Sequence, residues 1–330
     1  MDMTHTMAGS WRKVRVSRIT CETERIKAFE LTPEDGQPLW SWAAGAHTRV
    51  KLPSGTVRQY SLVGDPDDVS TYRLGVLREL AGRGGSAEMH EVLCEGAVIE
   101  ISAPINNFAL DDEQVPHLLI AGGIGITPIL SMARVLAKEG REWRLFYCTR
   151  TPADTAFLQD VRALESRCVE FVHDEGDASR GLNVLDLLRS APLESQVYVC
   201  GPRGLIDAVI YKAKEANFQD SRIHWEAFTA SGTQPKEERI AGSFEIELRR
   251  SDKILTVPPD KTILQVLRAE GIHVKSVCEE GYCGTCLTGV LEGVPDHRDD
   301  DLLTPEERES NAVMTVCCSR SKTAKLVLDL

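Results

Sequence analysis

Long hydrophobic runs are absent from this 330-residue sequence, and no apolar stretch approaches the roughly 20 residues that a membrane-spanning helix requires. The first ten residues, MDMTHTMAGS, lack the apolar core of a signal peptide, so we expect a cytoplasmic protein without membrane association. Positive charge is also scarce, because 38 Lys and Arg oppose 50 Asp and Glu. The net charge of −12 argues against nucleic acid as a partner, since phosphates are bound by basic surfaces.

Cysteine, in contrast, is plentiful, with ten residues in the chain. In a reducing cytoplasm such thiols rarely build a disulfide framework, and clustered cysteines more often bind metal or carry out redox chemistry. The chain length predicts two or three domains with hydrophobic cores of their own. The sequence contains no internal repeat and no low-complexity tract.

The first third of the chain is rich in short β-type runs. Segments such as HTRVKL, VRQYSLV and AVIEISAP are separated by turn residues, which predicts an antiparallel β-barrel over residues 1–110. One helix is expected in SAEMHEVL, with Ser86 as its N-cap.

Residues 111–229 show a different pattern of predicted strands and helices. Apolar runs such as HLLIAGG, WRLFYCT and QVYVCGP alternate with helical stretches, which predicts an α/β domain whose parallel sheet is covered by helices on both faces. Residues 230–241 are polar and contain Gly and Pro, so they are the best linker candidate. Residues 242–330 predict a third domain with a β-hairpin, a short helix, a cysteine loop and a final strand, KLVLDL.

Three cysteines of this last domain, Cys278, Cys283 and Cys286, are spaced C-x4-C-x2-C, and Cys317 and Cys318 follow about thirty residues later. The spacing is that of plant-type ferredoxins, in which four thiolates bind a [2Fe–2S] cluster. Glycines in the loop let the backbone curl around the inorganic core and let N–H groups approach the sulfurs. Adjacent side chains on a strand point to opposite faces, so only one of the last two cysteines can face the cluster.

Structural zinc is the alternative for these thiols. Zinc sites usually combine two closely spaced pairs of cysteine or histidine, and the second pair is missing here. His273 and His297 flank the loop without ligand spacing. The pattern therefore favours iron–sulfur.

A glycine-rich turn joins a predicted strand to a predicted helix in HLLIAGGIGITPILSM. Gly122, Gly123 and Gly125 would let a pyrophosphate touch the backbone, and a helix that begins near Thr127 would direct free N–H groups and its positive end toward it. The turn is not a Rossmann fingerprint, because Pro128 occupies the third glycine position. A tight strand–helix turn without a ligand is the alternative.

The run VRQYSLV carries Arg58, Tyr60 and Ser61, a set of residues that can contact a flavin. The tyrosine ring can stack on the isoalloxazine, the arginine can pair with a phosphate, and the serine can hydrogen-bond near the hydride-accepting nitrogen. Taken alone, the motif also fits an ordinary strand with one polar face. GRGGS at 82–86 follows, where glycines lead into a helix and form a second candidate phosphate cradle.

These motifs together resemble the phthalate dioxygenase reductase family. CEEGYCGTCLTG with VCCSR resembles its C-terminal ferredoxin domain, GGIGITP and YVCGP resemble its pyridine-nucleotide signatures, and R-x-Y-S resembles its flavin signature. The resemblance covers nearly the whole chain. It implies a multidomain fold with an antiparallel flavin barrel, an α/β nucleotide domain and a plant-type ferredoxin domain of the α+β (β-grasp) class.

The resemblance also implies roles for individual residues. The residues implied for FMN, which is favoured over FAD, are Arg58, Tyr60, Ser61, Arg83, Gly84, Gly85, Ser86 and Phe228. Those implied for NADH are Gly122, Gly123, Gly125, Thr127, Cys200, Gly201 and Pro202, with Glu226 assisting nicotinamide placement. The implied cluster ligands are Cys278, Cys283, Cys286 and Cys317, since the family's fourth ligand precedes x-Ser-Arg.

The implied activity is that of an NADH-dependent reductase. Electrons would pass from NADH to FMN, to the [2Fe–2S] cluster and on to a Rieske-type aromatic-ring oxygenase or O-demethylase. A flavin is needed between the other two groups, because nicotinamide donates two electrons at once and the cluster accepts one at a time. No catalytic acid or base is assigned, since the cofactors carry the chemistry. Glu279, Glu280 and Tyr282 would contact the oxygenase or form a solvated rim.

Three alternatives stay open. The same electron chain could serve a cytochrome P450 or another monooxygenase. Arg150, at the end of the second strand of the parallel sheet, could favour the 2′-phosphate of NADPH over NADH. A zinc-stapled binding protein without enzymatic activity is the third alternative, and such a protein would be colourless.

Overall fold

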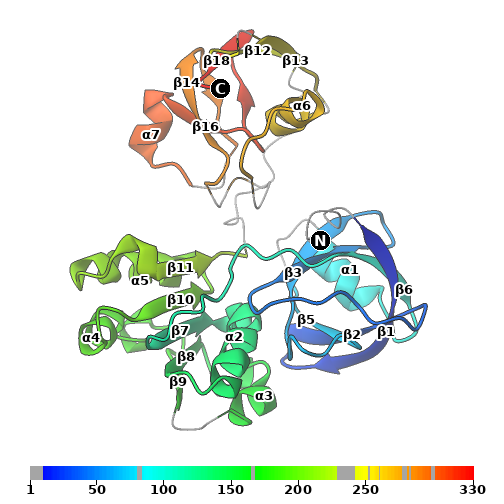
Figure 1. Cartoon of the computed structure of the whole chain (residues 1–330), viewed down its shortest axis with the longest axis vertical. Coiled ribbons are helices and arrows are strands. Elements are labelled where there is room, and N and C mark those ends of the chain that lie inside the picture. Colours follow the sequence, from blue (N-terminus) through cyan, green and yellow to red (C-terminus); the bar gives the residue numbers. More distant parts are fainter. Residues whose placement is uncertain are drawn as a thin grey trace. The chain divides into compact units, whose positions relative to one another are not determined.

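The computed structural model describes residues 10–79, 84–164, 168–228, 242–251, 253–259, 261–276, 281, 284–298 and 302–330. The chain divides into two compact units, Met1–Phe228 and Thr229–Leu330 (Figure 1). Several predicted features lie outside the described residues, namely the linker at 230–241, Arg83, Cys278, Glu279, Glu280, Tyr282 and Cys283. Within the described ranges, no helix is both long and apolar enough to cross a membrane.

The first unit begins with a six-stranded antiparallel sheet in the order β4-β3-β6-β1-β2-β5. Its strands are β1 (Trp11–Cys21), β2 (Ile26–Pro33), β3 (His47–Lys51), β4 (Val57–Ser61), β5 (Tyr72–Leu77) and β6 (Val98–Ser102). A bridge between Leu62 and Leu74 joins the two edges, so the sheet closes on itself. Alternate residues such as Val14 and Val16 point inward and fill an apolar core. The predicted antiparallel barrel is therefore confirmed.

A short helix, α1 (Gly85–Glu91), packs on the barrel where a helix was predicted. Its N-cap is Gly84 with a φ of 81°, so the prediction that Ser86 caps the helix is wrong. Glycine takes this position because it adopts a positive φ without steric cost. Ser86 lies in the first turn instead, and its hydroxyl accepts a hydrogen bond from the backbone N–H of Glu79.

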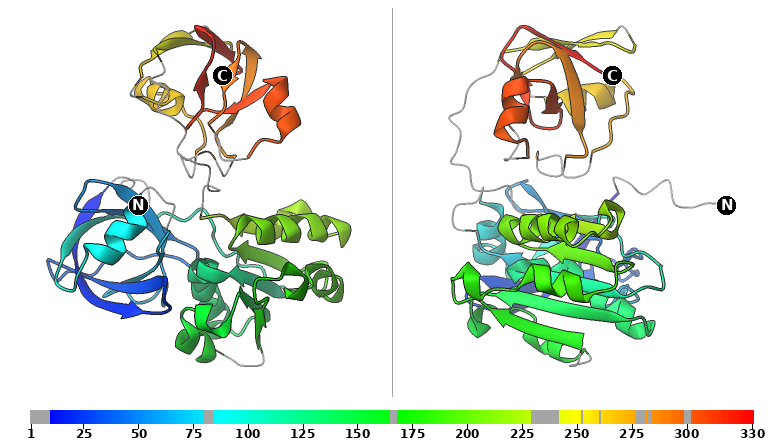
Figure 2. Two further views of the ribbon diagram at one scale, coloured as in Figure 1. Left: turned by 180° about the vertical axis from the view of Figure 1, so that it is seen from behind. Right: turned by 90° about the vertical axis from the view of Figure 1, so that its left-hand side faces the viewer.

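The second half of this unit is a five-stranded parallel sheet in the order β11-β10-β7-β8-β9. The strands are β7 (His117–Gly122), β8 (Trp143–Thr149), β9 (Val169–His173), β10 (Gln196–Cys200) and β11 (Ile223–Glu226). The helices are α2 (Ile126–Lys138), α3 (Leu158–Arg162), α4 (Val184–Ser190) and α5 (Arg203–Glu215), with 3-10 turns η1 (Gly123–Gly125), η2 (Pro152–Asp154), η4 (Ala178–Arg180) and η5 (Asp220–Arg222). Helices α2 and α3 lie on the side of the sheet that faces the barrel, and α4 and α5 cover the other side (Figure 1, Figure 2).

A partly buried ion network joins the barrel to the α2–α3 side of the sheet. Arg73 of β5 places one guanidinium nitrogen 2.8 Å from Asp160 of α3 and the other 2.8 Å from Glu22. The guanidinium also lies 4.8 Å from the centre of the Phe157 ring. Glu22 accepts a hydrogen bond from the backbone N–H of Phe157, and Arg134 of α2 pairs with Asp160. Because these charges are shielded from water, they interact more strongly than exposed ion pairs.

The second unit is a mixed sheet in the order β13-β12-β18-β14-β16, in which β12 runs parallel to β18 and antiparallel to β13. Its elements are β12 (Phe244–Leu248), β13 (Lys253–Val257), α6 (Ile263–Ala269), β14 (Leu287–Glu292), β15 (Pro295–Asp296), α7 (Pro305–Ser310), β16 (Val313–Thr315), β17 (Arg320–Ser321) and β18 (Lys325–Leu328). Both helices start with capping boxes, Thr262 with Gln265 and Thr304 with Glu307. The predicted hairpin, helix and final strand are confirmed, whereas β14, β16 and α7 were not predicted.

Candidate cofactor sites

The flavin motif lies on β4, which pairs with β3 in the barrel. The Arg58 side chain runs against the start of α1, because a Cβ added to Gly85 would lie 2.5 Å from the Arg58 Nε atom. The absence of a side chain at position 85 therefore permits this close approach. The structure thus brings a guanidinium to the Gly84–Gly85 turn, and both of these features were predicted to contact a phosphate.

Tyr60 and Ser61 occupy opposite faces of β4. The Tyr60 ring packs against the barrel core, and burial raises the pKa of its phenol well above the usual value. Ser61 is 4% exposed, and its Oγ atom has no hydrogen-bond partner among the described residues. A buried polar atom without a partner costs about 1–3 kcal/mol, so this hydroxyl is suited to a ligand.

The turns that follow β7 and β10 touch each other at the carboxyl ends of these adjacent parallel strands. A Cβ on Gly125 would lie 2.2 Å from the carbonyl oxygen of Cys200, and a Cβ on Gly201 would lie 2.8 Å from the Cα of Gly122. Pro202 belongs to the same contact, because its Cδ atom would lie 2.6 Å from a Cβ added to Gly122. Ligands of open parallel sheets bind outside the carboxyl ends of the strands, so the two predicted nucleotide signatures meet where a dinucleotide is expected.

The first turn of α2 connects these glycines to the barrel. Helix α2 begins at Ile126, directly after the η1 turn that contains Gly123. Thr127 is 1% exposed, and its hydroxyl donates a hydrogen bond to the carbonyl of Ile124 at 3.0 Å. The methyl group of Thr127 lies against Gly75 of β5, where it would be 2.6 Å from an added Cβ. The predicted nucleotide turn is thus in contact with the barrel strand that neighbours the flavin motif.

Cys200 and Glu226 lie side by side at the ends of β10 and β11. The Glu226 Oε2 atom has no partner among the described residues, and burial raises the pKa of this carboxyl to about 8. Burial, and secondly the nearby Glu226, raise the pKa of the Cys200 thiol well above its usual value. Both groups are therefore predominantly neutral at pH 7. Phe228, two residues beyond Glu226, is half-buried against the same apolar cluster that contains Cys200.

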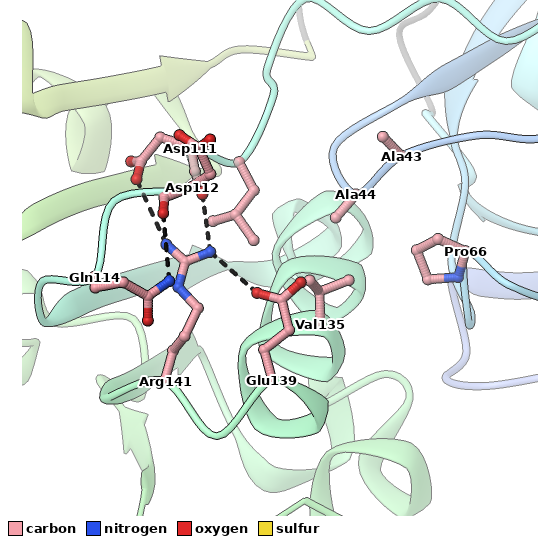
Figure 3. Close-up of a pocket in the computed structure, with 10 residues that line it drawn as sticks. Ala43, Ala44, Pro66, Asp111, Asp112, Gln114, Val135, Glu139 and Arg141 are labelled. Atoms are coloured by element: carbon pink, nitrogen blue, oxygen red, sulfur yellow. Dashed lines mark hydrogen bonds and ion pairs between the residues drawn. The ribbon is translucent and has the colours of Figure 1, made fainter.

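A groove of about 480 Å³ lies between the barrel residues Ala43 and Pro66 and nucleotide-domain residues such as Glu139 (Figure 3). Its buried cation is Arg141, which donates a hydrogen bond to the carbonyl of Asp111 at 2.9 Å and lies 3.3 Å from the Glu139 carboxylate. Arg141 thus pairs with two of the carboxylates that line the groove, Asp111 and Glu139. None of the residues predicted to hold a cofactor lines it.

In the second unit, Cys286 and Cys317 are both buried, and their Sγ atoms lie 3.1 Å apart. Two thiolates that bind one tetrahedral metal ion at about 2.3 Å lie roughly 3.8 Å apart, so this pair can share one iron after a small adjustment. The neighbouring Cys318 is less buried, and its Sγ lies 3.1 Å from the Thr315 hydroxyl. The described part of the chain therefore carries two of the four predicted ligands, and their geometry favours Cys317 over Cys318.

Two groups of residues at the junction of barrel and sheet were not predicted. Arg73 and Asp160 form the ion network, and His47 of β3 lies opposite Ser61. No motif surrounds either group. At these positions the sequence offers only isolated charged or imidazole side chains, which more often lie at the surface.

A barrel with a flavin-type motif, a parallel sheet with paired glycine turns and a ferredoxin-type unit define an iron–sulfur flavoprotein reductase. A family model described as "2Fe-2S iron-sulfur cluster binding domain" matches residues 246–322. A second, described as "Dimethylamine monooxygenase subunit DmmA-like, N-terminal domain", matches residues 101–223.

Whole-chain similarities extend this assignment. The vanillate O-demethylase oxidoreductase of Pseudomonas sp. (strain HR199 / DSM 7063) is 42% identical over 319 residues, which cover 96% of this chain and 99% of that relative. The solved structure of phthalate dioxygenase reductase is 37% identical with a TM-score of 0.74, and the match covers 97% of this chain and 98% of that chain. Full-length CYP116B46 from Tepidiphilus thermophilus is 36% identical with a TM-score of 0.76, but the match covers only 42% of that longer chain.

The chain belongs to the phthalate dioxygenase reductase family. The predicted multidomain fold, the oxidoreductase class and a [2Fe–2S] domain within an electron-transfer chain are confirmed. The match to the iron–sulfur domain model leaves the zinc alternative without support.

Proposed function

We propose that this chain is the cytoplasmic reductase component of a Rieske-type oxygenase or O-demethylase, to which its iron–sulfur domain delivers electrons from NADH. The observation that carries the proposal is the alignment of 96% of the chain with a vanillate O-demethylase oxidoreductase, which includes barrel, nucleotide sheet and ferredoxin unit in one order. Bound together, the three groups would convert a two-electron hydride donor into a source of single electrons. The residues of the chain bind these groups, orient them and exclude water.

For FMN we propose the Gly84–Ser86 turn, Arg83 and Arg58 at the phosphate, and Tyr60, Ser61 and Phe228 at the ring. The position of Arg58 against Gly85 supports this assignment, because the guanidinium is held next to backbone N–H groups that start a helix. The unpartnered Ser61 hydroxyl supports the second part, since a ring nitrogen or oxygen would satisfy it.

For NADH we propose the two turns that meet at the ends of β7 and β10, with Gly122, Gly123, Gly125 and Thr127 on one side and Cys200, Gly201 and Pro202 on the other. Their backbones approach so closely that no side chain intervenes, and a dinucleotide can lie directly on the peptide groups. Cys200 and Glu226 lie side by side at the ends of β10 and β11, and because both are predominantly neutral at pH 7 neither would place a charge beside the nicotinamide.

For the cluster we propose Cys278, Cys283, Cys286 and Cys317 as ligands. We further propose domain boundaries at residues 1–110, 111–229 and 242–330, with 230–241 as the linker. Brief proteolysis of the native protein should then cut first within 230–241 and release a coloured fragment of the ferredoxin domain. Cleavage first inside 242–330 would contradict these boundaries.

The function is tested with full-length protein in two steps. Purified protein should contain flavin, iron and sulfide, and its visible spectrum should bleach when NADH is added without air. The reduced protein should then support product formation by a Rieske-type O-demethylase oxygenase component, in parallel with a cytochrome P450 as the competing acceptor. Turnover of the P450 without turnover of the Rieske component would overturn the proposed partner. Steady-state kinetics that prefer NADPH would overturn the proposed coenzyme and would implicate Arg150.

A further inference from the structure

His47 is a buried histidine whose ring atom Nε2 has no hydrogen-bond partner among the described residues. The side chain is 5% exposed at the start of β3. Burial, and secondly the nearby Arg49, lower the pKa of the imidazole to about 4. The ring is therefore neutral at pH 7 and presents one N–H donor and one acceptor nitrogen. A neutral buried ring whose Nε2 atom finds no partner in the described part of the chain is suited to a ligand.

The strand register places His47 in one row with Ser61 and Gly75. His47 pairs directly with Ser61 across β3 and β4. Leu62 and Leu74 form an antiparallel bridge. Ser61 precedes Leu62 and Gly75 follows Leu74, so Ser61 and Gly75 are opposite each other in the same register. Directly opposed residues share a face of the sheet with Cβ atoms about 4.5–5.5 Å apart, so His47 and Ser61 are in reach of one common group.

This row faces away from the barrel core. The alternate residues Thr48 and Val50 point inward, since the Thr48 hydroxyl donates to the carbonyl of Ser102 at 2.7 Å and Val50 belongs to the core cluster. Helix α2 covers the outer side, where the Ser131 hydroxyl accepts a hydrogen bond from the backbone N–H of Gly45 at 3.2 Å. Together with Thr127 on Gly75, these contacts enclose the row between the barrel and the predicted nucleotide turn.

We propose that His47 is a second hydrogen-bonding residue of the flavin site, set beside Ser61 so that both side chains meet the polar edge of the isoalloxazine. This inference rests on the proposed function, since it takes Ser61 as a flavin contact. The ring edge carries alternating nitrogen and oxygen atoms that donate and accept hydrogen bonds. Two adjacent protein groups, a hydroxyl and a neutral imidazole, match such an edge.

The test uses variants that imitate each ring nitrogen separately. His47→Gln places an amide near the position of Nε2, whereas His47→Asn places it near Nδ1, and His47→Leu offers neither. Deflavinated full-length protein is titrated with FMN, and binding is followed by the quenching of flavin fluorescence. We expect the Leu and Asn variants to bind FMN about tenfold more weakly, as for one lost hydrogen bond, and the Gln variant to stay within about threefold of wild type.

Two further readouts separate a flavin contact from a structural role. The visible flavin spectrum and its midpoint potential should shift in the Leu variant, while the thermal stability of its apoprotein should be equal or higher, because an unsatisfied buried atom is removed. Thr48→Val, on the inner face of the same strand, should lower apoprotein stability without changing FMN affinity.

Equal FMN affinity in the Leu, Asn and Gln variants, with unchanged flavin spectra, would overturn the proposal and reduce His47 to a buried residue beneath α2. If the Leu variant does not fold, the comparison of Gln with Asn still decides the matter. Failure of the wild-type apoprotein to bind FMN at all would refute the proposed function itself, which keeps the two failures distinct.

Discussion

We expect the free energy of unfolding of the wild-type protein to fall between pH 6 and pH 9, and we expect this decrease to be absent when Glu226 is replaced by glutamine. The carboxyl group is buried at the end of β11, its Oε2 atom has no partner among the described residues, and burial raises its pKa from 4.5 to about 8. A carboxyl whose pKa is higher in the folded than in the unfolded chain stabilises the fold while it is protonated. That stability is fully present below the unfolded pKa and is lost as the pH rises through the folded pKa.

The size of the effect follows from the shift. A difference of about 3.5 pKa units at 1.36 kcal/mol each corresponds to about 5 kcal/mol in total. Between pH 6 and about pH 8 the unfolded chain has released the proton and the folded chain still holds it, so integration from pH 6 to pH 9 gives about 2–3 kcal/mol, roughly half of the total. In a unit of this size each kcal/mol moves the Tm by roughly 2–4 °C, so the expected loss is about 5–10 °C.

Tryptophan fluorescence isolates the relevant part of the chain, because all five tryptophans, at positions 11, 40, 42, 143 and 225, lie in the first unit. Thermal unfolding is recorded at pH 6 and pH 9, with excess FMN, for wild type, Glu226→Gln and the matched control Glu142→Gln, whose side chain is exposed. We expect the Tm of wild type and of Glu142→Gln to fall from pH 6 to pH 9 by about 5–10 °C, and the Tm of Glu226→Gln to stay nearly constant over the same interval. A Tm that falls in parallel for all three proteins would refute the assignment of an unpaired, proton-binding carboxyl to position 226.

Arg73→Met removes the cation shared by two carboxylates across the barrel–sheet junction. Urea unfolding should show that the free energy of unfolding of the first unit falls by about 2 kcal/mol. Arg73→Lys should not restore it, because a single ammonium cannot contact both carboxylates as the forked guanidinium does. Cys317→Ser should abolish the visible circular dichroism and electron paramagnetic resonance signals of the cluster, whereas Cys318→Ser should keep them; the reverse result would reassign the fourth ligand. Gly125→Ala puts a Cβ 2.2 Å from a carbonyl oxygen of the neighbouring turn and should raise the KM for NADH at least tenfold. Gly204→Ala, which has open space around its added Cβ, should leave the KM unchanged, and a normal KM in both variants would show that the glycine turn is not needed for NADH.

The helices and strands could be predicted as far as local patterns specify them. The buried run of β7, the helix after it and the hairpin of β12 and β13 all carry the residue periodicity of their final structure. The first residue of α1 could not be predicted from such patterns. Ser86 is a residue type that favours the N-cap position, but the left-handed backbone conformation of Gly84 places the N-cap two residues earlier. Likewise β14 and β16 are short strands that exist because their partners cover them.

The candidate site shows the same division. The glycine turns and the cysteine spacing are local motifs, so the chemistry that they suggest could be predicted from the sequence alone. The pairing of Gly125 with Cys200 could not, since these residues are 75 positions apart and meet only because β7 and β10 are adjacent in the sheet. The place of Thr127 against Gly75 is equally remote, and it depends on how α2 docks on the barrel.

By itself, the sequence determined the order of the three structural parts and the kinds of group each can bind, because turns, periodicity and thiol spacing act over a few residues. Only the tertiary structure decided which distant atoms share a face, which polar groups lose water without gaining a partner, and hence which pKa values move. His47 and Ser61 become neighbours through strand register, and Glu226 becomes neutral through burial. Register and burial are collective properties of the packed chain, since desolvation depends on every segment that covers the group.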